Sequence, residues 1–382
     1  MSEQLSQYDE IRPYSPEELP AVLSELLEDP MFTAIVQNFF QGVPVEALKA
    51  KMLSCRNNLE FQKAFIYPLI KQLLAKNCTS LTFESALEPT KRYTYVSNHR
   101  DIVLDSALLS IVLIENGFED TPEIAIGDNL LIYPWIKKLV RVNKSFIVQR
   151  SLSMREMLES SRRMSSYMHY AINEKQQSIW IAQREGRAKD SNDRTQESVL
   201  KMMAMGGEGT PTERLKSLNI APLSISYEYD PCDYLKAQEF QQKRDNPDFK
   251  KSREDDLKNM QTGIFGYKGQ VHYQVAPCIN EWIDEMSTLP KGEFFSAVAQ
   301  RMDADIFRNY RLYPGNYVAA DLLEGCTRFA SHYTEEQKQQ FEKYVQSRIA
   351  LVELSNPDTA YLRERILEMY ANPVLNQLSV QQ

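Results

Sequence analysis

The first 85 residues carry apolar side chains at the three- and four-residue spacing of amphipathic helices. Ser15 and Glu18 form a capping box, and Pro16 follows at a position that suits the first turn of a helix. Leucine and valine then recur at helical spacing, at Leu19, Val22, Leu23, Leu26 and Leu27. Further apolar stripes cover residues 39–52 and 61–74. The pattern predicts a helical N-terminal segment over residues 1–85.

From residue 91 the pattern changes to short apolar runs rich in Tyr, Val and Ile, separated by longer amphipathic stretches. Six runs are strand candidates, at residues 93–97, 123–126, 145–148, 178–182, 222–227 and 270–275. Between them, residues 153–173 predict a long helix, and a capping box at Thr210 and Glu213 begins another. Strands that alternate with helices predict an α/β fold over residues 86–290, with a mainly parallel sheet flanked by helices.

Two other segments lack this alternation. Residues 230–262 are dense in charge and predict an exposed helical insertion ahead of the last strand. After Pro290 the pattern is helical again, and Thr334 with Gln337 forms another capping box. We therefore predict a helical C-terminal extension over residues 291–382.

Composition fits a globular protein rather than a disordered or membrane-spanning one. Hydrophobic residues make up 43% of the 382 positions and charged residues 25%. No uncharged apolar run reaches the length of about 18 residues that a spanning helix needs, and the start at residues 1–5 is polar and acidic, unlike a secretory signal. Five cysteines, never spaced C-x-x-C, read as reduced thiols. These features predict a cytoplasmic location.

The net charge of −8 argues against general nucleic-acid binding. One segment is cationic nevertheless, because residues 129–150 hold five Lys or Arg and no acidic residue. Tyr133, Trp135 and Ile136 lie beside Lys137 and Lys138, which is typical of a helix that contacts a membrane surface. The same pattern equally fits a helix that packs its apolar side on the sheet, and both interpretations stay open here.

His99 has the most informative context of the four histidines. It directly follows the first predicted strand, where an open α/β sheet places its ligands, and Asp101 and Asp105 follow within six residues. An imidazole whose tautomer is fixed by a carboxylate can act as a general base on a hydroxyl group. The same residues could instead hold a metal or cap the next helix.

Three more sequence blocks follow His99 in order. One runs from Gly127 to Arg150, the next contains Glu185-Gly186-Arg187, and the last is an apolar strand behind Pro222. Together with the His99 block, they resemble the glycerol-phosphate O-acyltransferase family over residues 93–230, and residues 263–272 resemble a late strand of that family. The family transfers fatty acyl groups from a thioester to glycerol-3-phosphate or its lysolipid product.

The chain departs from the family pattern at two places. The family spaces its histidine and aspartate as H-x4-D, which would put the acid at Leu104, whereas this chain has H-x5-D to Asp105. We take Asp105 as the orienting acid, because the turn before the helix can absorb one residue, and Asp101 as the reserve candidate. In the third block the family's arginine would fall at Ala188.

The resemblance implies a direct acyl transfer without an acyl-enzyme. His99 would remove the proton from the acceptor hydroxyl while Asp105, or else Asp101, holds the imidazole. The donor would be acyl-CoA or acyl-ACP as a co-substrate, and the scheme needs no metal and no further cofactor. Since the substrates are lipids and no spanning helix is predicted, the resemblance also implies peripheral contact with the inner face of the membrane.

The resemblance further implies the substrate-binding residues. Arg150 matches the arginine of the second block, and Arg187 with Lys189 would share the role of the third-block arginine. Guanidinium groups suit a phosphate because they donate two parallel hydrogen bonds. Glu185 and Gly186 match the positions that orient the acceptor. Arg100 and Arg184 are additional candidates beside these blocks.

Other functions remain compatible with the sequence. A first alternative is the same transfer to a different acceptor, for example an amino-acid-containing lysolipid, because both departures lie in blocks that handle the acceptor. A non-catalytic lipid-binding protein of the same fold is a second alternative. A hydrolase is a third, although the chain has no G-x-S-x-G sequence and no second histidine near His99. The first and second acylation positions are not distinguished.

Overall fold

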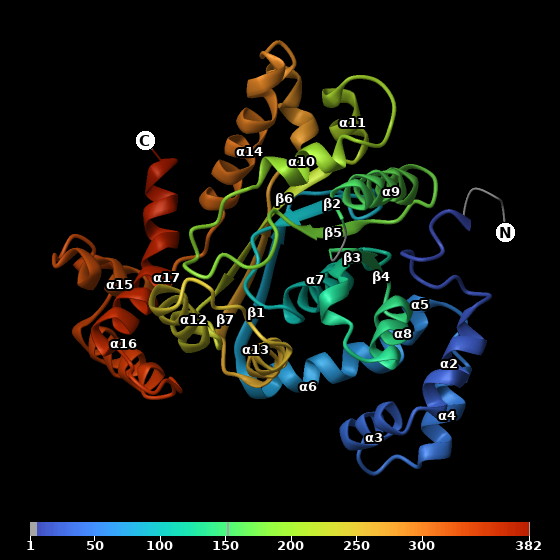
Figure 1. Ribbon diagram of the computed structural model, residues 1–382, viewed down its shortest axis with the longest axis horizontal. Coiled ribbons are helices and arrows are strands. Elements are labelled where there is room, and N and C mark those ends of the chain that lie inside the picture. Colours follow the sequence, from blue (N-terminus) through green and yellow to red (C-terminus); the bar gives the residue numbers. More distant parts are fainter. Residues whose placement is uncertain (1–5, 151–152, 382) are drawn as a thin grey trace.

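The computed structural model describes residues 6–150 and 153–381 (Figure 1). The polar start at residues 1–5, on which the predicted location partly rests, lies outside the described residues. In the described part of the chain, no helix is both long enough and apolar enough to cross a membrane.

A seven-stranded sheet forms the centre of the molecule, in the order β1-β7-β6-β2-β5-β3-β4. The strands are β1 (Cys78–Ser85), β2 (Thr94–Ser97), β3 (Glu123–Gly127), β4 (Ser145–Val148), β5 (Ile179–Ala182), β6 (Ile220–Tyr227) and β7 (Gly269–Val275). Neighbouring strands are parallel except β6 and β7, so β1 and β7 run opposite to the other five. The predicted α/β fold with a mainly parallel sheet is therefore confirmed.

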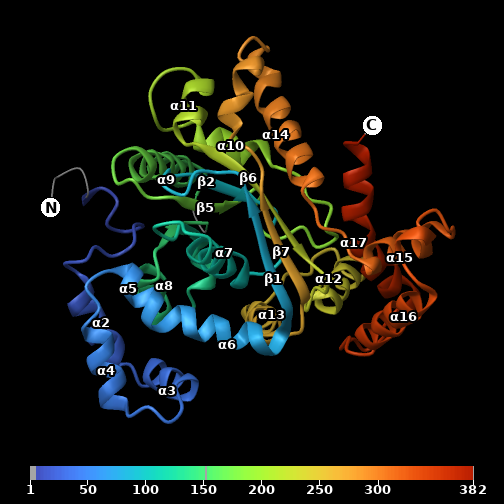
Figure 2. The same ribbon diagram turned by 180° about the vertical axis from the view of Figure 1, so that it is seen from behind.

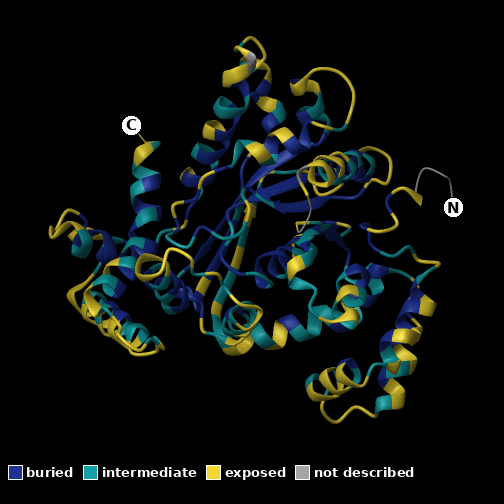
Figure 3. Ribbon diagram, viewed as in Figure 1, coloured by how far each residue is buried: buried dark blue, intermediate teal, exposed yellow. Residues whose placement is uncertain are grey.

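Helices cover both faces of the sheet (Figures 1 and 2). One face packs on α9 (Met154–Asn173), α10 (Glu197–Met203), α11 (Pro211–Ser217) and α14 (Lys291–Arg308). The other face packs on α6 (Tyr67–Asn77) and α7 (Leu104–Glu115). Most strands are buried, whereas the edge strand β1 alternates partly buried and exposed residues and the outer helix faces are exposed (Figure 3). Alternate side chains show this division, since Ile181 belongs to the first core and Trp180 to the second.

The N-terminal helices form a small core of their own. They are α2 (Leu19–Glu28), α3 (Pro30–Phe39), α4 (Val45–Leu53), α5 (Asn58–Phe61) and a π-helical turn (Gln62–Ile66) that leads into α6. The predicted capping box forms in part: Glu18 accepts a hydrogen bond from the Ser15 amide at 2.6 Å and also binds Arg12. Helix α2 starts at Leu19, later than predicted, because Glu18 is engaged by residues ahead of the helix.

The helical prediction for residues 1–85 is wrong at its end, because residues 78–85 form β1. This strand pairs with β7 along its whole length, so its partner is nearly two hundred residues away in the chain. The other predicted strands all form, with ends within two residues of the prediction. The capping boxes at Thr210 and Thr334 are also confirmed.

Residues 230–262 form α12 (Asp233–Asp245) and the greater part of α13 (Arg253–Phe265). The prediction of an exposed insertion is wrong for α12, because several of its polar residues are buried, among them Asp233 and Lys236. Arg348 and Tyr344 bind Asp233 at 2.6 Å each. Asp233 of α12 therefore faces the C-terminal helices, whereas the last charged residues of this helix, such as Lys243 and Asp245, stay exposed.

The C-terminal extension packs around its own apolar core. It contains α14, α15 (Pro314–Glu324), α16 (Glu335–Ile349) and α17 (Thr359–Ser379). A short helical turn (Ala330–His332) joins α15 to α16, whereas α14 packs on the sheet rather than in this core. Outside the extension, α8 (Pro134–Val142) lies between β3 and β4. Figure 1 shows α15, α16 and α17 beside α12, on the side of the sheet away from α2–α4.

Candidate active site

His99 and Asp105 meet where β2 ends and α7 begins. Nδ1 of His99 lies 2.8 Å from Oδ2 of Asp105, and the carboxylate is fully buried. The imidazole packs edge-on against Trp180, with ring centroids 5.6 Å apart, and its side chain keeps 14% exposure. Nε2 has no hydrogen-bond partner among the residues that the structure describes. The ring is thus anchored at one nitrogen and open at the other.

Backbone amides hold one oxygen of the Asp105 carboxylate, Oδ2. Oδ2 also accepts hydrogen bonds from the amides of Arg100 and Asp101, at 2.6 and 3.1 Å. Asp105 lies in the first turn of α7, so its carboxylate reaches back over the loop that carries His99. Since this oxygen is an acceptor, His99 donates through Nδ1 and presents Nε2 as the free base.

Asp101 has a different position. Its Oδ1 accepts hydrogen bonds from the amides of Val103 and Leu104, at 2.9 and 2.7 Å, and so caps the start of α7. Its Oδ2 packs against Gly263 of α13, where an added Cβ would lie only 2.1 Å away. Burial, and then repulsion from Asp105, raises the pKa of Asp101. The structure brings Asp105, and not Asp101, to His99.

Arg100 is held by a buried carboxylate. Its Nη1 and Nη2 donate to the two oxygens of Asp193, at 3.0 and 2.6 Å. Tyr310, between α14 and α15, donates to the same carboxylate at 2.5 Å, and Asn98 approaches it at 3.4 Å. As a candidate for phosphate binding, Arg100 is therefore already paired. Sequence reasoning missed Asp193 and Tyr310, which lie 93 and 210 positions beyond Arg100.

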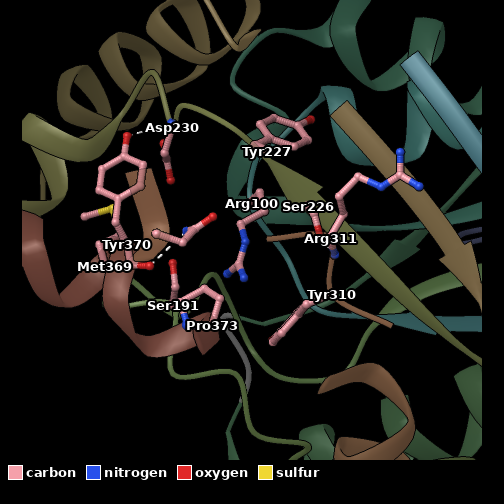
Figure 4. A pocket seen from close by; sticks show the side chains of 11 residues that line it. Arg100, Ser191, Ser226, Tyr227, Asp230, Tyr310, Arg311, Met369, Tyr370 and Pro373 are labelled. Atoms are coloured by element: carbon pink, nitrogen blue, oxygen red, sulfur yellow. Dashed lines mark hydrogen bonds between the residues drawn. The ribbon is translucent and has the colours of Figure 1, made fainter. Parts of the chain in front are cut away.

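A small pocket lies beside Arg100 (Figure 4). Tyr227, Tyr310 and Asp230 line it together with residues of α17, including Tyr370 and Pro373. The C-terminal extension thus lines much of this pocket, to which the loop after β2 contributes Arg100. Further bonds join α17 to the loop after β5, since Asn372 donates to the carbonyl of Asp190 at 2.7 Å.

Arg150 and Glu185 lie at the same edge of the sheet, after β4 and β5. Nη1 of Arg150 lies 3.8 Å from Oε1 of Glu185, and the side chains are 36% and 73% exposed. Gly127 makes room for this arginine, because an added Cβ would lie 2.9 Å from Nε of Arg150. Gly186 has φ +67°, a conformation that favours glycine. Arg150 is the predicted phosphate ligand that stays accessible.

Arg187 and Lys189 contact the helices of the insertion. Arg187 donates to Asn259 of α13 at 3.0 Å, and Lys189 forms an ion pair with Glu239 of α12. Burial lowers the pKa of Lys189 to about 8, although Glu239 opposes this shift. Ala188, at the position of the family's arginine, is buried. The two residues that were predicted to share the phosphate-binding role therefore already bind protein groups, Arg187 on α13 and Lys189 on α12.

The cationic segment of residues 129–150 mostly packs inside the molecule. Trp135 of α8 contacts Phe32 of α3, with ring centroids 6.1 Å apart. Lys138 pairs with Glu25 at 2.6 Å, and Lys144 is buried against Asp120. The sequence left two interpretations open, a helix that contacts a membrane and a helix that packs its apolar side on the sheet. The contacts of α8 favour a packed helix, but α8 packs on the N-terminal helices instead of the sheet.

Residues 79–225 match the family model described as Acyltransferase. Among solved structures, the chain is similar to the 1-acyl-sn-glycerophosphate (LPA) acyltransferase PlsC from Thermotoga maritima. The identity is 11% and the TM-score 0.37, over 75% of this chain and 95% of that chain. A search of curated proteins finds no match. The range that matches the acyltransferase model contains the pair of His99 and Asp105.

Proposed function

We propose that this enzyme moves a fatty acyl group from acyl-CoA or acyl-ACP to the hydroxyl of glycerol-3-phosphate or 1-acylglycerol-3-phosphate. The observation that carries the proposal is the anchored imidazole of His99, which presents a free Nε2 at the sheet edge where Arg150 is also exposed. A base and a guanidinium at one edge suit an acceptor that has both a hydroxyl and a phosphate group.

The residues account for each proton in this reaction. Nε2 of His99 removes the proton from the acceptor hydroxyl, and the oxygen forms a bond to the thioester carbonyl carbon. Asp105 stabilises the resulting imidazolium through Nδ1. When the tetrahedral intermediate collapses, the carbon–sulfur bond breaks and the thiolate takes the proton back from His99. The products are an ester and a free thiol, and no acyl-enzyme, metal or prosthetic group takes part.

Arg150 is the residue that we assign to the acceptor phosphate. Its exposed guanidinium can donate two parallel hydrogen bonds, and Glu185 beside it orients the group. Lys189 is engaged by Glu239 of α12, and Arg187 by Asn259 of α13. Nη1 of Arg187 is buried without a hydrogen-bond partner among the described residues, so this arginine keeps a donor for the acceptor. A lysolipid with a different headgroup is the second candidate acceptor, because this chain has Ala188 at the position of the third-block arginine.

Thiol release is expected to depend on the acceptor. With purified enzyme and palmitoyl-CoA or acyl-ACP, we expect release at least about tenfold faster when glycerol-3-phosphate or lysophosphatidate is added. A panel of lysolipids without the phosphate monoester, including amino-acid lysolipids, separates the candidate acceptors. Release that is equally fast without any acceptor would indicate a hydrolase, and release only with a phosphate-free acceptor would overturn the assignment of the phosphate to Arg150.

Peripheral contact with the inner face of the membrane is part of the same proposal, because the acyl chains of the product reside in a bilayer. The exposed apolar side chains Met31 and Ile35 of α3 support it. They lie close to α8, whose Lys137 is exposed. Apolar and cationic groups on one corner favour an anionic bilayer surface.

Binding to anionic vesicles is expected to fall about tenfold in the Met31→Asp/Ile35→Asp variant, because two apolar side chains leave the interface. Co-sedimentation with phosphatidylglycerol vesicles measures this. Leu351→Asp is the matched control, since Leu351 is 47% exposed but lies beyond α16. Equal binding of both variants and the wild type would contradict contact through α3.

A further inference from the structure

Two buried tyrosines bond to Asp105 from neighbouring strands. The hydroxyl of Tyr227, at the end of β6, donates to the carboxylate oxygen Oδ1 at 3.0 Å. The hydroxyl of Tyr273, on β7, donates to the main-chain carbonyl of the same residue at 2.8 Å. Both side chains are buried. The two phenols therefore make similar hydrogen bonds to one residue but reach different groups on it.

The bond from Tyr227 completes the set of donors around the carboxylate. Oδ2 receives His99 and the amides of Arg100 and Asp101, whereas Oδ1 receives Tyr227. Among the described residues, His99 is the only ion-pair partner of Asp105. Without Tyr227, Oδ1 would be a buried anionic oxygen with no partner among the described residues, and only the donors to Oδ2 would oppose rotation of the carboxylate about its Cβ–Cγ bond.

We propose that Tyr227 is a positioning residue, which fixes the rotation of the Asp105 carboxylate so that Oδ2 faces Nδ1 of His99. The inference rests on the proposed function, since it assigns a role to His99 as the base. Tyr227 acts through Asp105 and contacts no reacting atom.

The surroundings of Tyr227 suit this role. Figure 4 shows its ring at the wall of the pocket beside Arg100, with the hydroxyl directed away from the pocket. Burial, and then the nearby Tyr273 and Asp105, raises the pKa of Tyr227 well above its usual value. The phenol therefore keeps its proton and stays a donor. Asp101, which lies toward α13, is a further titratable group near Tyr227.

The first test compares Tyr227→Phe with Tyr273→Phe. Each variant loses one buried hydroxyl and one hydrogen bond, so both are expected to lose similar stability. Only Tyr227→Phe is expected to lower kcat, by about tenfold, with KM for donor and acceptor unchanged, because a hydrogen bond to a charged group is the stronger one. An equal fall in kcat for both variants would indicate general loosening of the sheet and would overturn the proposal.

A double-mutant cycle tests whether Tyr227 acts through Asp105. In the Asp105→Asn background, Tyr227→Phe is expected to change kcat by less than about twofold, because the carboxylate that it orients is gone. A further tenfold fall in that background would show that Tyr227 acts by another route. Thermal unfolding of each variant shows that the proteins compared are folded.

A second readout needs no turnover. The Nδ1 proton of His99 lies in a charge-assisted hydrogen bond and should give a far-downfield proton NMR signal, assigned as the signal that His99→Ala removes. Tyr227→Phe is expected to shift or broaden it, while Tyr273→Phe leaves it in place. If the wild type releases no thiol with any acceptor, the proposed function fails, and this signal alone still decides the role of Tyr227. An unchanged signal in Tyr227→Phe overturns the inference in either case.

Discussion

Replacing His99 with alanine is expected to lower kcat for acyl transfer by about 10²–10⁴-fold. The variant loses an imidazole that has a free basic nitrogen and an anchoring carboxylate behind it. KM is expected to change little, because His99 acts on the proton that moves in the transition state. Rates of thiol release at saturating donor and acceptor measure the effect.

The matched control is His332→Ala, which removes an exposed imidazole stacked on Tyr317 in the C-terminal extension. Its activity is expected to equal that of the wild type. An active His99→Ala enzyme would rule out general-base catalysis by this residue. The same assay discriminates between the two aspartates. Two main-chain amides donate to Oδ2 of Asp105, so the side-chain oxygen of Asp105→Asn takes this place, and the variant loses the negative charge that stabilises the imidazolium. Asp101→Asn can still accept from the amides that it caps.

The strands were predictable where a local pattern defines them. Residues 145–148 and 178–182 are short, apolar and flanked by amphipathic stretches, and they form β4 and β5. The strand at 78–85 was not predicted, because it follows α6 directly, without a glycine or proline to end the helix. Its pairing with β7 stabilises it, and a partner so distant in sequence leaves no local signal.

In the candidate site, too, residues close in sequence were predictable and partners distant in sequence were not. The loop of His99 and Asp105 lies within seven residues, so the sequence predicts both, and the helix start at Leu104 explains how the extra residue is accommodated. The carboxylate of Asp105 simply sits in the first turn and reaches back to the loop amides. Tyr227 and Asp193 come from segments far along the chain, and neither belongs to a pattern that marks it as a partner of this loop.

Asp193→Ala is expected to lower the free energy of unfolding by about 3–5 kcal/mol, because it leaves a buried guanidinium without its anion. The side chains of Arg100 and Asp193 are 6% and 1% exposed, so water cannot replace the lost partner. Tyr310 and Asn98 lose an acceptor at the same time. Urea denaturation at neutral pH measures the change.

Controls separate this buried pair from ordinary ion pairs. Glu88→Ala breaks an exposed pair with Lys91 and is expected to leave the urea midpoint unchanged. Tyr310→Phe removes one of the hydrogen bonds to Asp193 but keeps the ion pair, so its loss should be the smaller one. An Asp193→Ala protein as stable as the wild type would mean that Arg100 pairs with another anion. The candidate is Asp230, which lines the same pocket and interacts electrostatically with Arg100.

The loss of Asp193 is also expected to change the position of Asp105 relative to His99. The amide of Arg100 donates to Asp105, while the side chain of the same residue is fixed by Asp193. Releasing that side chain therefore loosens the loop that sets the carboxylate opposite His99. We expect kcat of the folded Asp193→Ala protein to fall as well, and by more than in Tyr310→Phe. If the stability falls but kcat does not, then Asp193 joins the C-terminal extension to the sheet without positioning the loop.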